Sequence, residues 1–309
     1  MSVLTKIKEL HIENTSLCNA NCVMCPRGGM ERYQGPMSDE IFNKCLNDLI
    51  PSPPVALHFH LNGEPMLLPI DKLVSRIKMA REALPNTGLI FFTNGSLMTH
   101  EATDKILSSD LDEICFSFDG GTKEDYEKIR RGLNFEKVRE NIHYFQSMNL
   151  YLNGKTHPKK KRVKTHAFIV PQRDNRGSID QFMRMFQQMK IDDVGGSGVQ
   201  NIGGLIDSKE FRTDLQQVDM SLINSPCWRI FKDLDVMADG NIPVCCQCVQ
   251  GIPVLGNAME RNLLEFWNGP EMNDIRIKFI QGKKNEIPFC KDCDYMPGHG
   301  ATEWDWWPR

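Results

Sequence analysis

Three cysteines lie within eight residues near the start of the chain: Cys18, Cys22 and Cys25. They directly follow an apolar run, residues 7–12, which predicts a β-strand. Three thiolates from one short loop can hold three irons of a cubane iron–sulfur cluster and leave the fourth iron without a protein ligand. An iron with a vacant position can bind a substrate, which distinguishes a catalytic cluster from an electron carrier. A zinc knuckle and buried free cysteines are the alternatives for the same residues.

A second group of cysteines lies near the end of the chain. Eleven cysteines in a secreted protein would predict a disulfide framework, but such proteins are normally shorter and carry an export signal, and we recognise none here. In a reducing compartment, clustered cysteines indicate metal binding. Two groups therefore predict two metal sites in two modules, whereas Cys45 and Cys115 stand alone. The second group comprises Cys227, Cys245, Cys246, Cys248, Cys290 and Cys293.

Length and charge restrict the class of protein. The chain has 309 residues, enough for one large domain or for a large and a small one. Its net charge of −3 argues against a general nucleic-acid-binding protein. No apolar run approaches the length that spans a membrane. We therefore expect a cytoplasmic protein that binds neither nucleic acid nor membrane.

Strand and helix patterns alternate through the first two thirds of the chain. Six strand–helix units in succession predict an α/β fold with parallel strands and right-handed crossovers. Functional loops then lie at the carboxyl ends of the strands. The predicted strands are residues 7–12, 55–61, 89–92, 113–118, 163–170 and 193–200. The predicted helices are residues 39–49, 70–84, 100–107, 135–148 and 179–189.

The alternation ends near residue 205, and a different pattern follows. Two short apolar segments flank Asp239 and Gly240 and predict a β-hairpin. Short helices and a cysteine pair come next, and three tryptophans form an aromatic tail. We predict one domain over residues 1–205 and a smaller one over residues 206–309. The predicted elements of the smaller domain are residues 234–237, 242–244, 263–267 and 271–280, and the tail holds Trp304, Trp306 and Trp307.

Four loops that follow predicted strands carry motifs. They are the cysteine loop, Gly-Glu-Pro at 63–65, Thr-Asn-Gly at 93–95 and Ser-Phe-Asp at 117–119. Together they resemble the core of the radical S-adenosylmethionine (SAM) superfamily. The resemblance implies a partial (β/α)6 barrel and a 4Fe-4S cluster whose open iron is chelated by the amino and carboxylate groups of SAM.

The resemblance also implies which residues surround SAM. Glu64 and backbone carbonyls near Gly63 are expected to receive the amino group, since an ammonium group needs anionic or carbonyl acceptors. Arg131, after the fourth-strand motif, is expected to meet the carboxylate. The implied cluster ligands are Cys18, Cys22 and Cys25, and the implied SAM-binding residues are Gly63, Glu64, Asn94, Ser117, Asp119 and Arg131.

The C-terminal cysteines resemble the SPASM/twitch extension of the same superfamily. Cys227, Cys245, Cys290 and Cys293 fit the shorter twitch form. The resemblance implies that these four thiolates complete one auxiliary 4Fe-4S cluster without an open iron. The second domain is therefore expected to be a small SPASM/twitch domain with a β-hairpin, short helices and the aromatic tail.

Two further pairs of residues could contribute chemistry. Cys246 and Cys248 are surplus to the auxiliary cluster, so they either pack beside Cys245 or provide a free thiol that donates a hydrogen atom. His58 and His60 point to one side of the second predicted strand. They are either satisfied core histidines or substrate contacts.

The implied reaction begins with one electron from a flavodoxin- or ferredoxin-type donor. SAM is then cleaved to methionine and a 5′-deoxyadenosyl radical, which abstracts hydrogen from a C–H bond. Our first hypothesis is a dehydrogenase that oxidises a small polar substrate, a sugar or aminocyclitol, by two electrons. The twitch pattern resembles that of aminocyclitol dehydrogenases of the 2-deoxy-scyllo-inosamine type, and we see no added peptide-binding domain.

Three other hypotheses use the same residues. An epimerase would return hydrogen to the opposite face of the substrate from Cys246 or Cys248. A peptide-modifying enzyme would oxidise or crosslink a ribosomal peptide. A protein without catalytic activity would use the cysteines for electron transfer or zinc binding.

Overall fold

The computed structural model describes residues 5–152, 162–212 and 227–294. One parallel sheet of seven strands, in the order β8-β7-β5-β4-β3-β1-β9, forms its centre. Six of these strands come from the six predicted strand–helix units, so the predicted α/β fold is confirmed. The strands are β1 (Glu9–Ile12), β3 (Ala56–His58), β4 (Gly88–Thr93), β5 (Glu113–Ser117), β7 (Lys164–Ile169), β8 (Asp193–Gly196) and β9 (Asp233–Val236).

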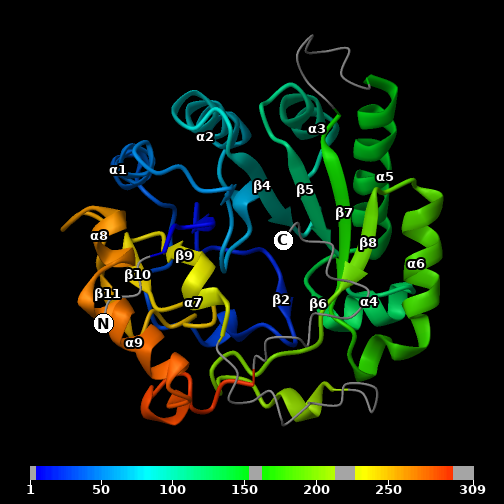
Figure 1. Cartoon of the computed structure of the whole chain (residues 1–309). Helices are drawn as coiled ribbons and strands as arrows, with labels where there is room; N and C mark the ends of the chain where they lie inside the picture. Colours follow the sequence, from blue (N-terminus) through cyan, green and yellow to red (C-terminus); the bar gives the residue numbers. More distant parts are fainter. Residues whose placement is uncertain (1–4, 153–161, 213–226, 295–309) are drawn as a thin grey trace.

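Helices cover one face of this sheet (Figure 1). Three of the six begin at a side-chain cap named here: Ser38 accepts a hydrogen bond from the Ile41 amide, and Thr99 and Thr122 do the same for their helices. The sequence analysis missed α4, which is only seven residues long and too short for a clear periodicity. The helices are α1 (Asp39–Leu49), α2 (Ile70–Ala83), α3 (His100–Leu107), α4 (Lys123–Ile129), α5 (Phe135–Leu152) and α6 (Ile179–Gln188).

The two faces of the sheet differ in chemistry, because side chains alternate between them along each strand. On the face toward the helices, Leu10, Leu57, Leu89 and Ile114 are fully buried in the apolar core. The opposite face, which we call the inner face, carries charged and imidazole groups. It presents Glu9, His11, His58, Glu113, His166, Asp233 and Asp235.

The C-terminal domain continues the barrel sheet. The segments on either side of Asp239 and Gly240 meet at a tight turn, in which the Met237 amide donates to Asn241 O at 2.9 Å. Their pairing differs from the predicted hairpin, since β9 adds to β1 in parallel and β10 (Asn241–Pro243) pairs instead with β11 (Val254–Asn257). All four residues of β9 are buried, as expected for a strand at the edge of a parallel sheet that is covered on both faces.

Short helices complete the described C-terminal region, and the second of the three packs against α1 (Figure 1). These are α7 (Arg229–Lys232), α8 (Leu263–Trp267) and α9 (Pro270–Ile280). The Trp267 indole donates to Thr5 O at 2.9 Å, which ties this domain to the start of the chain. The predicted aromatic tail lies outside the described residues. Among the described residues, no helix has the length and apolar character needed to cross a membrane.

Candidate active site

The first cysteine group lies in the loop that follows β1. Within it, β2 (Asn21–Cys22) pairs antiparallel with β6 (Arg130–Arg131), so the loop is held against the segment after α4. The Cys25 amide donates to Cys22 O at 3.0 Å, which folds the loop into a turn. Cys25 is exposed, whereas Cys18 and Cys22 are half-buried.

The three thiols form a suitable donor set for an iron–sulfur cluster. Burial raises the pKa of the Cys22 thiol to about 11, Arg130 opposes that rise, and the charges of Cys25 and Cys18 add to it. Although Cys25 is exposed as a residue, the protein atoms around its sulfur raise the pKa of the thiol, and the charge of Cys18 adds to the rise. The three thiols therefore lie near enough for their charges to act on one another. A cationic metal centre would favour their deprotonated form, which is the form that binds iron.

The Gly-Glu-Pro segment lies directly against this loop. The Glu64 amide donates to Leu17 O at 2.8 Å. A Cβ at Gly63 would lie 2.0 Å from Thr15 O and 2.7 Å from Leu17 O. Any side chain at position 63 would therefore displace the backbone that leads into Cys18.

Glu64 joins the loops after β3 and β4. Its buried carboxylate accepts hydrogen bonds from Thr93 Oγ1 at 2.7 Å, from the Asn94 amide at 2.7 Å and from the Met66 amide at 3.1 Å. Burial raises the pKa of Glu64, and these hydrogen bonds oppose the rise. The contact of Glu64 with the SAM amino group stays a prediction. The structure shows in addition that Glu64 holds the loops after β3 and β4 together.

Asn94 reaches the cysteine loop through a closed ring of amide and hydroxyl groups. Asn94 Nδ2 donates to Asn19 Oδ1, Asn19 Nδ2 donates to Ser96 Oγ, and the Ser96 amide donates to Asn94 Oδ1, each at 2.9 Å. Sequence reasoning identified Asn94 but missed Asn19 and Ser96. The position of Asn19 between two cysteines was the available signal.

The residues predicted after the fourth strand divide into buried and exposed groups. Asp119 is fully buried, lies 2.7 Å from Arg130 Nη2 and accepts a hydrogen bond from the Val170 amide. Burial raises the pKa of Asp119, and Arg130 opposes that effect. Arg131 is exposed beside the cysteine loop, and Ser117 is half-buried at the end of β5. Arg130, which sequence reasoning left out, is therefore the arginine that interacts with Asp119 and the thiols.

The four thiols predicted to hold an auxiliary cluster also influence one another. Burial raises the pKa of Cys227 to about 12, and the nearby Cys245 and Cys293 contribute to the rise. The pKa of Cys290 rises through burial and the charges of Cys245, Cys293 and Cys227. Lys284 Nζ donates to Cys293 O at 2.7 Å and fixes the turn between the last two cysteines. Four thiols from three separate segments are thus near enough for their charges to act on one another, and their role as ligands of one fully ligated cluster stays a prediction.

The two surplus cysteines have different surroundings. Cys248 is buried in the apolar core, and its amide donates to Cys245 O at 2.9 Å. Cys246 is half-buried. Burial raises the pKa of Cys246, Arg229 lowers it, and Asp235 raises it further. Cys246 therefore lies near carboxylates of the inner face, whereas Cys248 packs beside a proposed ligand.

The two predicted histidines lie among further polar residues of the inner face. His60 Nδ1 accepts a hydrogen bond from the Phe92 amide at 3.2 Å. Burial lowers the pKa of His58 to about 4, and the nearby His11 adds to this. The pKa of His11 is raised because Asp235, 2.9 Å away, outweighs burial. Sequence reasoning missed His11, although polar residues at alternate positions of the first strand were a signal for it.

Glu13 connects the two cysteine sites. Its fully buried carboxylate accepts two hydrogen bonds from Arg32, at 2.8 and 2.6 Å, and one from the Ala238 amide at 2.9 Å. Arg32 Nε also donates to Val249 O at 2.5 Å. One ion pair therefore joins the loop after β1 to the segments on both sides of Cys245.

Two family models match the chain at these sites. The Radical SAM superfamily model covers residues 12–156, and the SPASM model, described as an iron-sulfur cluster-binding domain, covers residues 227–294. The chain therefore combines a radical SAM domain over residues 12–156 with a C-terminal SPASM domain over residues 227–294. SAM and 4Fe-4S clusters are its cofactors. The assignment of each cysteine to a cluster stays a prediction, as does the boundary near residue 205.

Curated relatives match only part of their own length. A tungsten-containing aldehyde ferredoxin oxidoreductase cofactor-modifying protein of Pyrococcus furiosus is 28% identical over 151 residues, which are 47% of this chain and 41% of that protein. An uncharacterized protein of Treponema pallidum is 24% identical over 127 residues, 41% of this chain and 32% of that protein. The chain thus spans about two fifths or less of these relatives.

Solved structures share the fold over nearly the whole chain. BtrN in complex with AdoMet and 2-DOIA has a TM-score of 0.63 and 18% identity, over 96% of this chain and all of that one. Streptococcus suis SuiB bound to the precursor peptide SuiA has a TM-score of 0.66 and 14% identity, over 88% of this chain and 67% of that one. The structure of anSMEcpe with bound AdoMet has a TM-score of 0.64 and 17% identity, over 92% of this chain and 88% of that one. At these identities the similarity concerns the fold alone.

Proposed function

We propose that this enzyme oxidises an alcohol carbon of a small polar substrate, such as a sugar or aminocyclitol, by two electrons. The observation that carries the proposal is the chemistry of the inner face. Imidazole and carboxylate groups line several neighbouring strands there, where an apolar core would be expected if nothing bound. Hydroxyl and amino groups of a polar substrate would find donors and acceptors on this surface.

The chain's own residues position the reaction. SAM and its cluster, when bound, supply the radical that takes the substrate hydrogen, and an auxiliary cluster supplies an electron acceptor. Asn94, Glu64 and Gly63 hold the cysteine loop in place through the contacts described above. The proposed SAM contacts remain Gly63, Glu64, Asn94, Ser117, Asp119 and Arg131. Asp233, a buried carboxyl group on β9 whose pKa burial raises to about 7, is placed to accept the proton released as the alcohol becomes a carbonyl.

Proximity of the inner face to the second cysteine group supports oxidation. The carboxylate of Asp235 affects the pKa of both Cys245 and Cys246. A substrate on the inner face would therefore lie near the proposed auxiliary ligands. A site with no open iron suits the removal of an electron, because it accepts charge without binding the substrate.

Peptide modification is the second candidate function. The structures of SuiB and anSMEcpe include peptides, a precursor peptide and the Kp18Cys peptide respectively. Both share the fold of this chain, so a peptide substrate is compatible with the architecture. Epimerisation is the third candidate, and Cys246, the half-buried surplus thiol near Asp235, is the better placed of the two proposed hydrogen donors.

Product analysis in heavy water tests the proposal. The reconstituted enzyme is given SAM, a reductant and panels of aminocyclitols, sugars and ribosomal peptides, and 5′-deoxyadenosine is measured for each. A dehydrogenase product is lighter than its substrate by two hydrogens and carries no solvent deuterium at carbon, whereas an epimerase incorporates deuterium. Replacing Cys246 and Cys248 by Ala should leave dehydrogenation intact. A response to peptides alone would contradict the proposed substrate class.

A further inference from the structure

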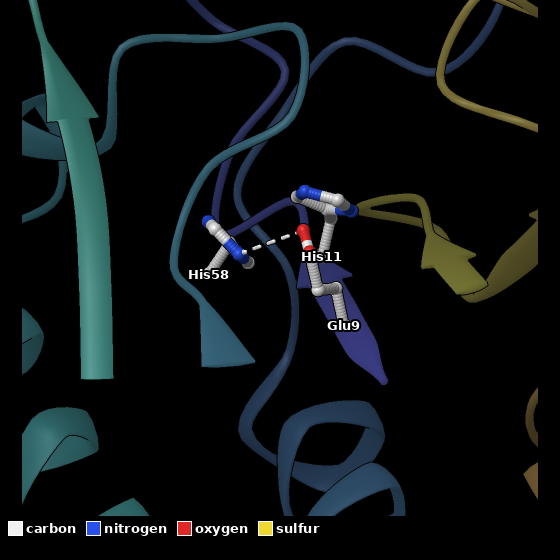
Figure 2. Close-up of side chains that lie close together, drawn as sticks. All are labelled: Glu9, His11 and His58. Carbon is white, nitrogen blue, oxygen red and sulfur yellow. Dashed lines mark ion pairs between the residues drawn. The ribbon is translucent and has the colours of Figure 1, made fainter. Parts of the chain in front are cut away.

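Three side chains of the inner face converge between β1 and β3. Glu9 and His11 come from β1, and His58 comes from β3, where it lies opposite His11 in the register (Figure 2). One ligand atom from each lies within 4.8 Å of the other two. His58 Nε2 and Glu9 Oε2 are 3.6 Å apart, and the rings of His58 and His11 lie 4.3 Å apart between centroids. None of these residues belongs to either cysteine group.

We propose that Glu9, His11 and His58 bind a divalent transition-metal ion inside the barrel. Two imidazole nitrogens and one carboxylate oxygen form a ligand set that zinc and non-haem iron use in catalytic sites, with further coordination positions left open. Zinc bonds of about 2.0–2.2 Å place tetrahedral ligand atoms about 3.3–3.6 Å apart. The observed 3.6 Å between His58 and Glu9 is close to that spacing, so small side-chain movements would complete the site.

A second carboxylate orients the proposed ligand His11. His11 Nδ1 lies 2.9 Å from Asp235 Oδ1 on β9. This contact favours the proton on Nδ1 and directs Nε2 to a metal, as a carboxylate next to a metal-binding histidine commonly does. Asp233 and Asp235 are both buried on β9 beside Glu9 and His11. A divalent cation would offset the negative charge that β9 brings into the barrel.

Another histidine of the same face provides a matched control. His166 on β7 is as buried as His58, at 1% against 2% exposure. Its Nε2 lies 2.8 Å from Glu113 Oε2 and its Nδ1 lies 3.2 Å from Asp193 Oδ2. Both ring nitrogens therefore face carboxylates, and this histidine has no nitrogen to offer a metal. Replacing it tests the cost of removing a buried histidine from the inner face without removing a proposed ligand.

Zinc is the probe for the experiment. The whole protein is first reconstituted anaerobically with iron and sulfide, so that iron occupies the cluster cysteines, and is then incubated with one equivalent of zinc and desalted. Zinc and iron are counted by mass spectrometry, and the zinc environment is measured by X-ray absorption. We expect one retained zinc per chain with only nitrogen and oxygen ligands, at about 2.0–2.1 Å.

Variants then locate the zinc. Glu9→Gln and His58→Gln should each weaken zinc binding at least tenfold, and Asp235→Asn, which loses only the orienting contact, should weaken it by about 10- to 100-fold. His166→Gln should bind zinc as the unchanged protein does. Iron content and circular dichroism identify a variant that fails to fold. If one of the variants Glu9→Gln and His58→Gln fails to fold, the other still shows whether zinc binds at the proposed site.

Three outcomes would overturn the proposal. Absence of retained zinc is the first. Zinc bound at about 2.3 Å to sulfur, which would place it at surplus cysteines, is the second. Equal zinc retention by Glu9→Gln, His58→Gln and the unchanged protein is the third. None of these outcomes bears on whether the substrate is an alcohol or a peptide, so this proposal and the proposed function fail separately.

Discussion

The two cysteine sites are built in opposite ways. Cys18, Cys22 and Cys25 come from one exposed loop after β1, and the loop keeps its shape through polar contacts with neighbouring strand ends. Cys245 and Cys290 are instead buried in the apolar core, and their partners come from segments far apart in the sequence. Three cysteines from one loop leave one iron of a cluster open to a small molecule. Four cysteines that folding brings together from separate segments enclose a cluster. The difference supports the proposals that SAM binds at the first site and that the second site transfers electrons.

The strongest test removes the open site. Changing Cys18, Cys22 and Cys25 together to Ala should lower the iron content from about eight to about four per chain and abolish SAM cleavage. The reason is that no other described residue group offers a replacement for three thiolates at the end of β1. Iron is counted after anaerobic reconstitution, and 5′-deoxyadenosine is measured by chromatography.

Retention of SAM cleavage in this triple variant would contradict the assignment of the first site. The remaining iron provides the folding control, since the second site needs the fold to gather its ligands. A variant that lost all iron would be judged by circular dichroism before any conclusion about the cluster.

Opening the second site should separate the two activities. Changing Cys290 and Cys293 to Ala should also halve the iron, yet SAM cleavage should continue because the first loop is intact. Formation of oxidised product should fall at least about 100-fold, equivalent to about 2.7 kcal/mol of transition-state stabilisation. Both products are measured in the same reaction. The control variant Cys246→Ala, which changes a surplus thiol, should keep the full iron content. If the variant that lacks Cys290 and Cys293 lost SAM cleavage and oxidation to the same degree, the division of roles between the two sites would be refuted.

Sequence reasoning found the two sites but only part of what holds them. The strand–helix alternation and the cysteine spacing are local patterns, so the α/β fold and both cysteine groups could be predicted from them. Arg130 and Arg131 are adjacent on a strand and point to opposite faces, so only the pairing of β6 with β2 decides which one meets Asp119. The sequence motif alone favoured Arg131.

The joint between the two domains was not predictable for a related reason. The pairing of β9 with β1 links residues more than 200 positions apart, and no local pattern records it. The same pairing brings Asp235 to His11 and the Ala238 amide to Glu13. Long-range strand pairing thus creates the inner-face contacts, which explains why sequence reasoning identified His58 and His60 but missed their neighbours.

Glu13 tests how strongly the two sites are joined. Glu13→Gln leaves the Arg32 guanidinium, whose side chain is only 6% exposed, without its buried carboxylate. We expect the free energy of unfolding to fall by about 3–5 kcal/mol, since breaking a buried ion pair strands the remaining charge. Urea unfolding followed by circular dichroism measures it. Glu136→Gln, at an exposed pair with Arg139, should cost less than about 0.5 kcal/mol, and similar losses for the two variants would show that Glu13 does not join the domains.

Gly63 tests the precision of the first loop and should give the smallest effect. Gly63→Ala places a Cβ 2.0 Å from Thr15 O, so the cysteine loop must shift, at a cost of about 1–3 kcal/mol. We expect SAM affinity to fall about tenfold, about 1.4 kcal/mol, while the iron of the second site stays unchanged. Gly29→Ala is the matched control, because a Cβ there meets no atom within 4 Å. If both alanine variants bound SAM as tightly as the unchanged enzyme, close packing against the Gly-Glu-Pro segment would not be what positions the loop.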